Sequence, residues 1–307
     1  MEQLLDLSLL NSTIRMVTPI LLAALGGSLC ARVGLFNVGL EGFILVGAFS
    51  AVLGNHLTGS VALAVLFAAL SVLIFSLLFA YLSIDLKANV IVVGIASNFL
   101  ATGLTTYLLR VLFDVKGAFY DKDMHGLPQL DAGWLKEIPV LGDLFSGHSP
   151  LVYLAFVLVI AMHFFYYKTV PGFRLLAVGE NIVAAQSLGL KARRIQYSAI
   201  LVCGVLCGLA GAQLSLGQVT MFSEGMTAGR GFIALVAMML GQSTPFGIMG
   251  ASLLFGFMDA FSIRLQGLSL PTHFTLMLPY VMTIVAMFFF KDKNLLKGKA
   301  GAGGSSR

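Results

Sequence analysis

Long apolar runs separated by short polar segments dominate the pattern of this 307-residue chain. A helix that crosses a bilayer needs about 20 predominantly apolar residues. Measured against that length, the pattern predicts about nine membrane segments, of which 230–242 is short enough to be a broken or re-entrant piece. The segments are 13–31, 38–54, 61–84, 88–109, 150–167, 195–217, 230–242, 246–266 and 272–290. We therefore expect an all-α polytopic membrane protein whose transmembrane domain covers residues 1–290.

The composition supports this class, because 58% of the residues are hydrophobic and only 11% are charged. So few charges would leave the surface of a soluble protein poorly solvated. The net charge of +5 is therefore expected to report orientation in the membrane and not binding to nucleic acid. Cys30, Cys203 and Cys207 lie in apolar runs, which is typical of small buried side chains and not of a disulfide framework or a metal site.

Two polar segments set the predicted orientation. Residues 168–194 carry five basic side chains and one acid, whereas residues 110–149 carry six acids and four bases. Because basic loops of membrane proteins tend to stay in the cytoplasm, 168–194 is predicted to be cytoplasmic and 110–149 to lie outside. The N-terminus is then outside and the C-terminus inside. Residues 291–307 are expected to form a flexible, basic cytoplasmic tail.

Two stretches of the chain, 22–54 and 208–241, resemble each other. Each runs from a glycine-rich helix through a polar hinge that begins with phenylalanine and into another apolar helix. The hinges are predicted to face opposite sides of the membrane, which is typical of an inverted repeat with substrate passing between its halves. Chance similarity between glycine-rich membrane helices is the alternative.

Four charged residues fall inside apolar segments, where each costs roughly 2.5–3.5 kcal/mol to insert. Glu41 follows the first hinge, where a helix dipole would stabilise it, and it is either a pore or gate residue or a cap of the hinge. Arg230 occupies the corresponding place in the second stretch and is expected to anchor backbone carbonyl groups. Asp259 and Arg264 are predicted to form an interfacial ion pair, with a proton relay as the alternative.

Amide and aromatic side chains gather around the two hinges. A pathway for a sugar or a nucleoside needs amides that bind hydroxyl groups and aromatic rings that cover sugar or base faces. Helix packing is the alternative role for each of these side chains. The predicted pathway residues are Phe36, Asn37, Glu41, Asn98, Phe99, Phe222, Arg230 and Phe232.

The cytoplasmic segment contains the pattern of a docking helix. A turn and a helix cap at 179–181 precede the sequence IVAAQSLG, whose Ala184 and Ala185 leave a thin face that could enter a groove on a partner. The chain has no G-x4-G-K-[ST] phosphate loop, so ATP would be hydrolysed by another polypeptide. We expect a transport subunit without catalytic residues of its own. The predicted docking residues are Gly179, Glu180, Asn181, Ala184, Ala185, Leu188 and Gly189.

Three segments carry a resemblance to a known family: GLFNVGLEGFILVGAF, VGENIVAAQSLGLKARRIQYSAILVCGVLCGLAGAQLSLG and MTAGRGFIALVAMMLGQSTPFGIMGASLLFGFMDA. They resemble the bacterial ABC permeases for branched-chain amino acids, ribose-type sugars and nucleosides, and most closely the shorter permease of basic-membrane-protein-type nucleoside importers. The resemblance covers nearly the whole chain. Its AGRGFIAL and GENxxAAxxLG patterns are specific for the family but distinguish substrates less well.

The resemblance implies a fold related to the vitamin B12 importer permease and a place in the bacterial inner membrane. It implies a heterodimer with a longer paralogous permease, a tandem-domain ATPase that binds ATP and Mg²⁺, and an extracytoplasmic solute-binding lipoprotein or periplasmic protein. Membrane lipid surrounds such a subunit, and no cofactor is expected on this chain. Nucleosides or related sugars are the implied cargo, although the hinge 28–30 is less polar than expected and puts the exact substrate in doubt.

Two other functions are consistent with a polytopic chain. A secondary transporter driven by an ion gradient would need intramembrane carboxylates at broken helices, and Glu41 alone gives this thin support. A membrane enzyme would need clustered histidines and carboxylates, whereas the five histidines are scattered along the sequence.

Overall fold

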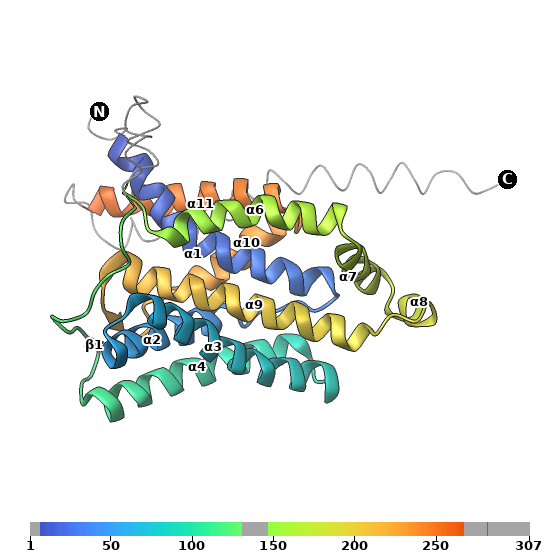
Figure 1. Ribbon diagram of the computed structural model, residues 1–307, viewed down its shortest axis with the longest axis horizontal. Coiled ribbons are helices and arrows are strands. Elements are labelled where there is room, and N and C mark those ends of the chain that lie inside the picture. Colours follow the sequence, from blue (N-terminus) through green and yellow to red (C-terminus); the bar gives the residue numbers. More distant parts are fainter. Residues whose placement is uncertain (1–6, 131–146, 267–280, 282–307) are drawn as a thin grey trace.

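The computed structural model, which describes residues 7–130, 147–266 and 281, consists of helices that run side by side (Figure 1). Seven helices in these ranges are long and apolar enough to cross a membrane, and α10 is shorter, with 11 residues. The membrane helices are α1 (Leu7–Arg32), α2 (Leu40–Thr58), α3 (Val61–Ala80), α4 (Val90–Phe113), α6 (Pro150–Lys168), α9 (Ala192–Leu214), α10 (Arg230–Leu240) and α11 (Pro245–Gln266). Segment 230–242 is thus the short piece that its sequence predicts, and 272–290 lies outside the described residues.

The helices form a buried centre and an outer layer. In α1, α2 and α9, 78–83% of the most apolar window is buried by other parts of the chain, against 28–33% in α3, α4 and α6. The outer helices expose leucine, isoleucine and phenylalanine side chains, which suit contact with lipid tails. Helix α9 is therefore central to the fold, because its most extensive contacts are with α1, α2 and α3.

Glycines let α9 approach its neighbours closely. A Cβ atom added to Gly208 would lie 2.9 Å from the carbonyl oxygen of Ala68 on α3, and one added to Gly47 on α2 would lie 2.8 Å from the Gly208 Cα atom. One turn further along α9, a side chain at Gly211 would overlap the backbone of Ala48. Small residues spaced in this way allow helix backbones to pack tightly where lipid offers no hydrophobic driving force.

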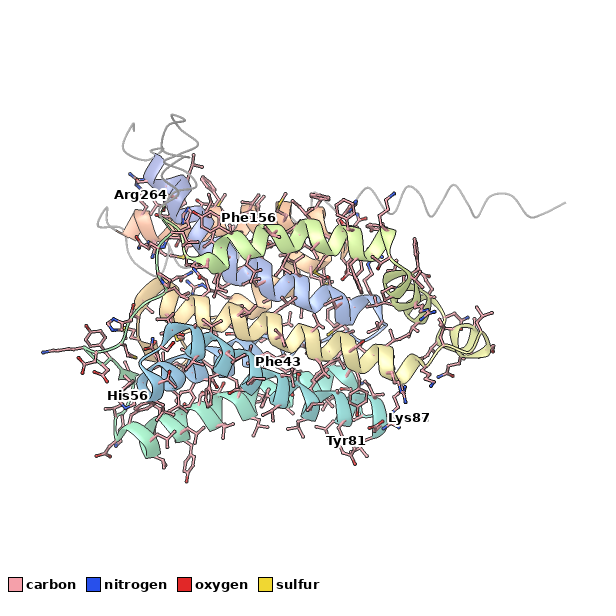
Figure 2. The ribbon with its side chains drawn as sticks, viewed as in Figure 1. Phe43, His56, Tyr81, Lys87, Phe156 and Arg264 are labelled. Atoms are coloured by element: carbon pink, nitrogen blue, oxygen red, sulfur yellow. The ribbon has the colours of Figure 1, made fainter. Side chains whose placement is uncertain are left out.

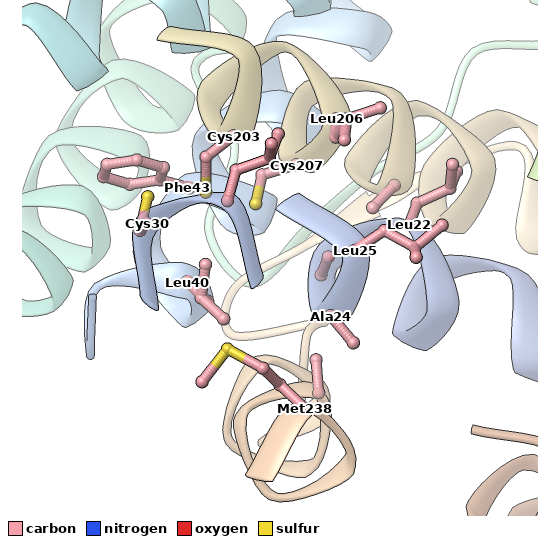
Figure 3. Packing of buried hydrophobic residues seen from close by; sticks show 14 of the residues in the cluster. Leu22, Ala24, Leu25, Cys30, Leu40, Phe43, Cys203, Leu206, Cys207 and Met238 are labelled. Carbon is pink, nitrogen blue, oxygen red and sulfur yellow. The ribbon is translucent and has the colours of Figure 1, made fainter. Parts of the chain in front are cut away.

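The centre of the bundle is filled by apolar and small side chains (Figure 3). Phe43 packs edge-to-face against Phe75 and Phe79, with ring centroids 5.7 and 5.8 Å away. Cys30, Cys203 and Cys207 are all buried and free of disulfides in this core, as their apolar sequence context predicts.

The polar connections collect at the two ends of the bundle. One end carries α7 (Val170–Glu180) and α8 (Ile182–Ser187), and the other carries a short antiparallel ribbon of β1 (Ala118–Phe119) and β2 (Phe222–Ser223) (Figure 1). Lys87 lies at the first end and His56 at the second (Figure 2). The basic segment 168–194 and the described parts of the acidic segment 110–149 are therefore on opposite sides, as the charge pattern predicts.

Widened helical turns end two of these helices. Tyr81–Asp85 continues α3 and Ser215–Val219 continues α9, each as a π-helical turn. The turn after α9 ends at Thr220, which has a positive φ of 50°, and the chain then enters β2. Both turns lie where a membrane helix meets a polar connection.

Substitution of Gly211 by valine tests the close packing of α2 against α9. The new side chain would overlap Ala48 and Ile44, so we expect it to lower the free energy of unfolding by about 1–3 kcal/mol or to prevent folding. Gly103→Val is the matched control, because no atom lies within 4 Å of a Cβ at Gly103. Thermal unfolding in detergent measures both, and equal melting temperatures would contradict this packing.

Candidate translocation and coupling site

Glu41 joins the beginnings of α2 and α10 inside the bundle. Its carboxylate accepts a hydrogen bond of 2.9 Å from the backbone N–H of Gly229 and one of 2.7 Å from that of Gly231. The first amides of a helix have no partner within the helix, and Gly229 offers no side-chain cap. Glu41 supplies the missing acceptors and places its negative charge at the positive end of the α10 dipole. The sequence leaves open whether Glu41 is a pore or gate residue or a cap of its own hinge. In the structure it acts as a cap, but of α10, which is distant in sequence.

The contact requires a glycine at position 231. A side chain there would overlap the backbone nitrogen and Cα atom of Glu41. Gly229 has φ of +83°, a left-handed conformation that glycine adopts without strain. Glycines on both sides of Arg230 therefore let the amides of α10 reach the carboxylate.

The contact joins two residues that follow hinges predicted to face opposite sides of the membrane. Phe222 lies in the ribbon at one end of the bundle, and the hinge that holds Phe36 follows Arg32, which contacts α7 at the other end. Glu41 and the start of α10 are nevertheless in direct contact. Residues at corresponding positions of the two similar stretches therefore meet. The similarity of the two stretches does not by itself determine how close their residues lie in the folded protein.

Arg230 and Asp259 form an ion pair beside this contact. The Arg230 guanidinium lies 3.1 Å from the Asp259 carboxylate, and both side chains are more than four-fifths buried. The predicted pair of Asp259 with Arg264 is wrong, because Arg264 instead donates to the Ser8 hydroxyl on α1. Arg230 also donates a long 3.5 Å hydrogen bond to the Met226 carbonyl, in agreement with its predicted role as an anchor.

Two asparagines hold the hinge before α2. Asn37 is buried, and its side-chain oxygen accepts from the Gly39 amide at 2.8 Å. The Asn98 side chain on α4 accepts from the Gly42 amide at 2.8 Å and donates to the Val38 carbonyl at 3.1 Å. Their amide groups are thus bound to the protein backbone, and both residues position the hinge in this conformation.

The predicted aromatic residues do not surround one cavity. Phe222 is fully buried against Phe49, with 5.2 Å between ring centroids, and Phe36 packs on the central core. Phe99 is 75% exposed on the outer helix α4, and Phe232 is 46% exposed on α10. The chain alone therefore does not bring the four rings into one cavity, and their place on a path completed by a partner subunit stays a prediction.

The predicted docking segment folds into two short helices, α7 and α8. Asn181 caps α8 as predicted, because its side chain accepts hydrogen bonds from the amides of Val183 and Ala184. Gly189 ends the segment with φ of +80°, a conformation that favours glycine. Ala184 and Glu180 are exposed.

The exposed face of α8 differs from the predicted one. Ala185 is buried against Val178 and Ala192 of the chain itself, so it cannot enter a groove on a partner. Val183 and Leu188 are instead 67% and 81% exposed. Large apolar side chains exposed on a polar end of the protein are typical of a protein contact surface.

Arg32 connects the docking segment to the end of α10. A side chain at Gly179 would overlap the carbonyl of Arg32, so α7 lies directly on the end of α1. The Arg32 guanidinium donates to the carbonyls of Ser243 and Gln242, at 3.1 and 3.3 Å. These two residues have positive φ values of 51° and 52°, which are strained for residues other than glycine.

A second link at the same end was not predicted from the sequence. Asp85 accepts from the Tyr197 hydroxyl at 2.6 Å and pairs with Arg193 at 2.7 Å. The contact ties the turn after α3 to the start of α9. The sequence did indicate that Asp85 and the basic segment 168–194 lie on the same side of the membrane. It did not indicate which basic or hydroxyl side chains Asp85 would bind.

The opposite end carries an interaction between α2 and the outer segment. His56 and Asp121 are 2.9 Å apart, and Phe113 and Phe119 stack beside the imidazole. Hydrogen bonds from the Asp123 amide and from His56 hold the pKa of the partly exposed Asp121 carboxyl below its usual value. Asp121 therefore stays ionised at neutral pH. The stability that its interactions add to the folded protein is lost only as the pH falls through that lowered pKa.

Comparisons with known proteins identify relatives that are permeases of membrane transporters. A family model described as "Branched-chain amino acid transport system / permease component" matches residues 9–287. The nucleoside ABC transporter permease protein NupC of Lactococcus lactis is 36% identical over 90% of this chain and 90% of its own length. The guanosine ABC transporter permease protein NupQ of Bacillus subtilis is 34% identical over 91% of this chain and 90% of its own length. NupP of the same organism is 30% identical over 85% of this chain and 74% of its own length.

One solved structure is similar, an inward-facing conformation of a metal-chelate type ABC transporter. It has a TM-score of 0.49 and 16% sequence identity, and the match covers 89% of this chain and 84% of that one.

A double-mutant cycle tests the ion pair of Arg230 and Asp259. Arg230→Met or Asp259→Leu alone leaves a largely buried charge without its partner, so we expect each to lower the free energy of unfolding by about 3 kcal/mol. The double variant removes both charges and is expected to recover most of this loss. Additive losses, measured by thermal unfolding, would show that the two residues do not interact.

Substitution of Leu188 by arginine tests the exposed face of α8. We expect it to reduce the copurification of an ATPase partner at least tenfold, since a charge would interrupt an apolar contact, while the melting temperature stays unchanged. Leu57→Arg, at an exposed leucine on the opposite end, should leave copurification unchanged. Ala185→Arg should instead lower the melting temperature, because Ala185 is buried. Normal copurification of the Leu188 variant would show that the exposed face of α8 is not the contact with the ATPase.

Proposed function

This chain belongs to the family of branched-chain amino acid transport system permease components, and within that family we propose that it carries nucleosides across the membrane. It is a multi-pass permease subunit of an ABC importer. The proposal of a nucleoside cargo is supported above all by two relatives, one named for nucleosides and one for guanosine, that match nine-tenths of the chain. Related simple sugars are the neighbouring class of cargo.

We propose that a second, paralogous permease completes the pathway. Bacillus subtilis has two relatives of this chain that are named for the same substrate, which fits a heterodimer of similar subunits. This chain would then provide half of the translocation path. Helix α10 is the part of its half best suited to respond to the partner, because it is short and exposes Phe232 near its start and Met239 near its end.

A separate ATPase that binds ATP and Mg²⁺ is proposed to dock on α7 and α8. The support is the exposed apolar face of Val183 and Leu188 at the basic end of the chain. Force applied there would reach Arg32 through Gly179, and the loop before α11 through the Arg32 guanidinium. A contiguous set of contacts thus leads from the docking helices to α10, although coupling along it has to be measured.

The remaining parts of the assembly follow from the same family. An extracytoplasmic solute-binding lipoprotein or periplasmic protein is proposed to deliver the cargo at the end that carries β1 and β2. We place the chain in a bacterial inner membrane with its N-terminus outside. The relationship to the vitamin B12 importer permease fold also remains a proposal.

Transport driven by an ion gradient is the alternative mechanism, and the described structure gives it little support. Glu41 is engaged by two backbone amides, and Asp259 is paired with Arg230. Neither carboxylate is free to bind a coupling ion in this conformation. An ABC importer for a neutral nucleoside needs no such site.

Uptake of labelled guanosine into proteoliposomes tests the function. Vesicles that contain the complete transporter, with binding protein outside and ATP inside, should take up guanosine, and an excess of unlabelled uridine should compete. Collapse of the proton gradient by an uncoupler should have no effect. Uptake that stops with the uncoupler would identify a secondary transporter, whereas competition by leucine and not by uridine would exclude a nucleoside cargo.

Single cysteines test the proposed orientation. In a variant in which Cys30, Cys203 and Cys207 are replaced by alanine, we expect Lys122→Cys to react with an impermeant thiol reagent in intact cells. Ser187→Cys should react only after the cells are opened, because positions 122 and 187 are both exposed but lie at opposite ends. The reverse labelling pattern would place the N-terminus inside.

A further inference from the structure

A basic hollow lies beside the docking helices, at the end of the bundle that carries α7 and α8. It has a volume of about 510 Å³ and is lined by parts of α6, α7, the turn after α8, and the start of α9. Arg174, Lys191 and Arg194 converge on it from three of these elements. Its other walls include the apolar side chains of Phe165, Leu175 and Ile195.

The three cations lack a protein counter-charge among the described residues. Arg193, their neighbour on α9, pairs with Asp85, but no ion pair within the described ranges involves Arg174, Lys191 or Arg194. Three positive charges around one hollow create a positive potential there, which attracts anions. The charge pattern therefore fits an anionic ligand.

The hollow continues along α9 into the region that the apolar helices would place in the membrane. A second hollow of about 490 Å³ shares Arg194 and Ser198 with the first and extends to Leu201. Because a helix rises about 1.5 Å per residue, Ser198 and Leu201 lie roughly 9 and 14 Å along α9 from Ala192. Val202, next in sequence, is 48% exposed, as expected of a side chain that faces lipid. The second hollow is also lined by Arg193 and Tyr197, so a ligand that fills both parts would keep its charge among the basic side chains and place an apolar part beside Leu201.

We propose that this hollow binds an anionic phospholipid of the membrane leaflet on the α7 and α8 side. The lipid phosphate lies among Arg174, Lys191 and Arg194, and an acyl chain follows α9 past Ser198 and Leu201. Basic pockets between membrane helices on the cytoplasmic side are suited to anionic head groups. A soluble protein domain that approaches from the polar end could reach the charges but not the part of the trough beside Leu201.

The position of the hollow gives the bound lipid a structural consequence. Leu188 and Gly189 line the same hollow, so the lipid would contact the turn that ends α8. It would fill the space between α6 and the docking helices and fix their relative positions. Lipid composition would then influence how firmly α8 is held when a partner docks.

Native mass spectrometry of the complete transporter tests the proposal. The complex is released from micelles that contain phosphatidylglycerol, and we compare the double variant Arg174→Gln/Arg194→Gln with the unmodified protein. We expect the double variant to lower the occupancy of one tightly bound phosphatidylglycerol by about tenfold or more, since each basic side chain near the surface contributes about 1 kcal/mol. The partner subunits are identical in both samples, so the difference reports this site.

Lys87→Gln/Lys168→Gln is the matched control, because it removes the same charge from the same end without altering the hollow. It should retain the lipid. Ser198→Trp provides a second variant that fills the trough and leaves every charge in place, and it should also lower the occupancy. Size-exclusion profiles of all variants should match that of the unmodified complex.

Three results would overturn the assignment. Equal loss of lipid in both double variants would show a general charge effect, and displacement of the lipid by millimolar inorganic phosphate would show a site for free phosphate. Loss of the ATPase subunit from the Arg174→Gln/Arg194→Gln complex with the lipid retained would show that these cations bind the partner protein.

Discussion

The first amides of a helix that starts inside a membrane need acceptors, and the fold depends on how α10 meets this requirement. Helix α10 has 11 residues and so spans about 16 Å, roughly half of a bilayer core. Its far end lies beside Arg32 at the polar end of the bundle, so its beginning lies within the bundle. Backbone groups at that depth need partners within the protein wherever lipid or apolar side chains surround them. The Glu41 carboxylate on α2 accepts hydrogen bonds from the first amides of α10. The same contact stabilises the negative charge of Glu41, which would be costly inside a membrane without a partner.

Several features of the chain follow from this contact. Gly229 and Gly231 admit the carboxylate, Arg230 and Asp259 neutralise each other beside it, and Asn98 holds the hinge that presents Glu41. At its other end, α10 leads into the turn that Arg32 binds. The contacts at the two ends of α10 thus connect the interior of the permease to the docking helices. A short helix held at both ends by polar contacts can move as a rigid unit when one of those contacts changes.

The sequence predicted the helices well because their length and the caps are local properties. Apolar runs identified all the described membrane helices, and Asn181 and Gly189 marked the limits of α8. It could not predict which face of a membrane helix is buried, since lipid and protein interior are both apolar. The 75% exposure of Phe99 on α4, for example, was not evident from its sequence context. Helix α8 has six residues, too few for a clear periodicity, so the burial of Ala185 was missed. Asp259 was paired with Arg264 because that residue is near in sequence, whereas its partner Arg230 is 29 residues away.

The most direct test of this account is ATP-driven guanosine uptake by the complete transporter with Glu41 replaced by glutamine or by alanine. Glutamine keeps one side-chain oxygen that can accept from the start of α10, so substantial uptake should remain, without dependence on the proton gradient. Alanine leaves the amides of Gly229 and Gly231 without acceptors, and it should abolish uptake or reduce it at least tenfold while guanosine still binds to the separate binding protein. Uptake by the alanine variant at the unmodified rate would contradict the central role of this contact.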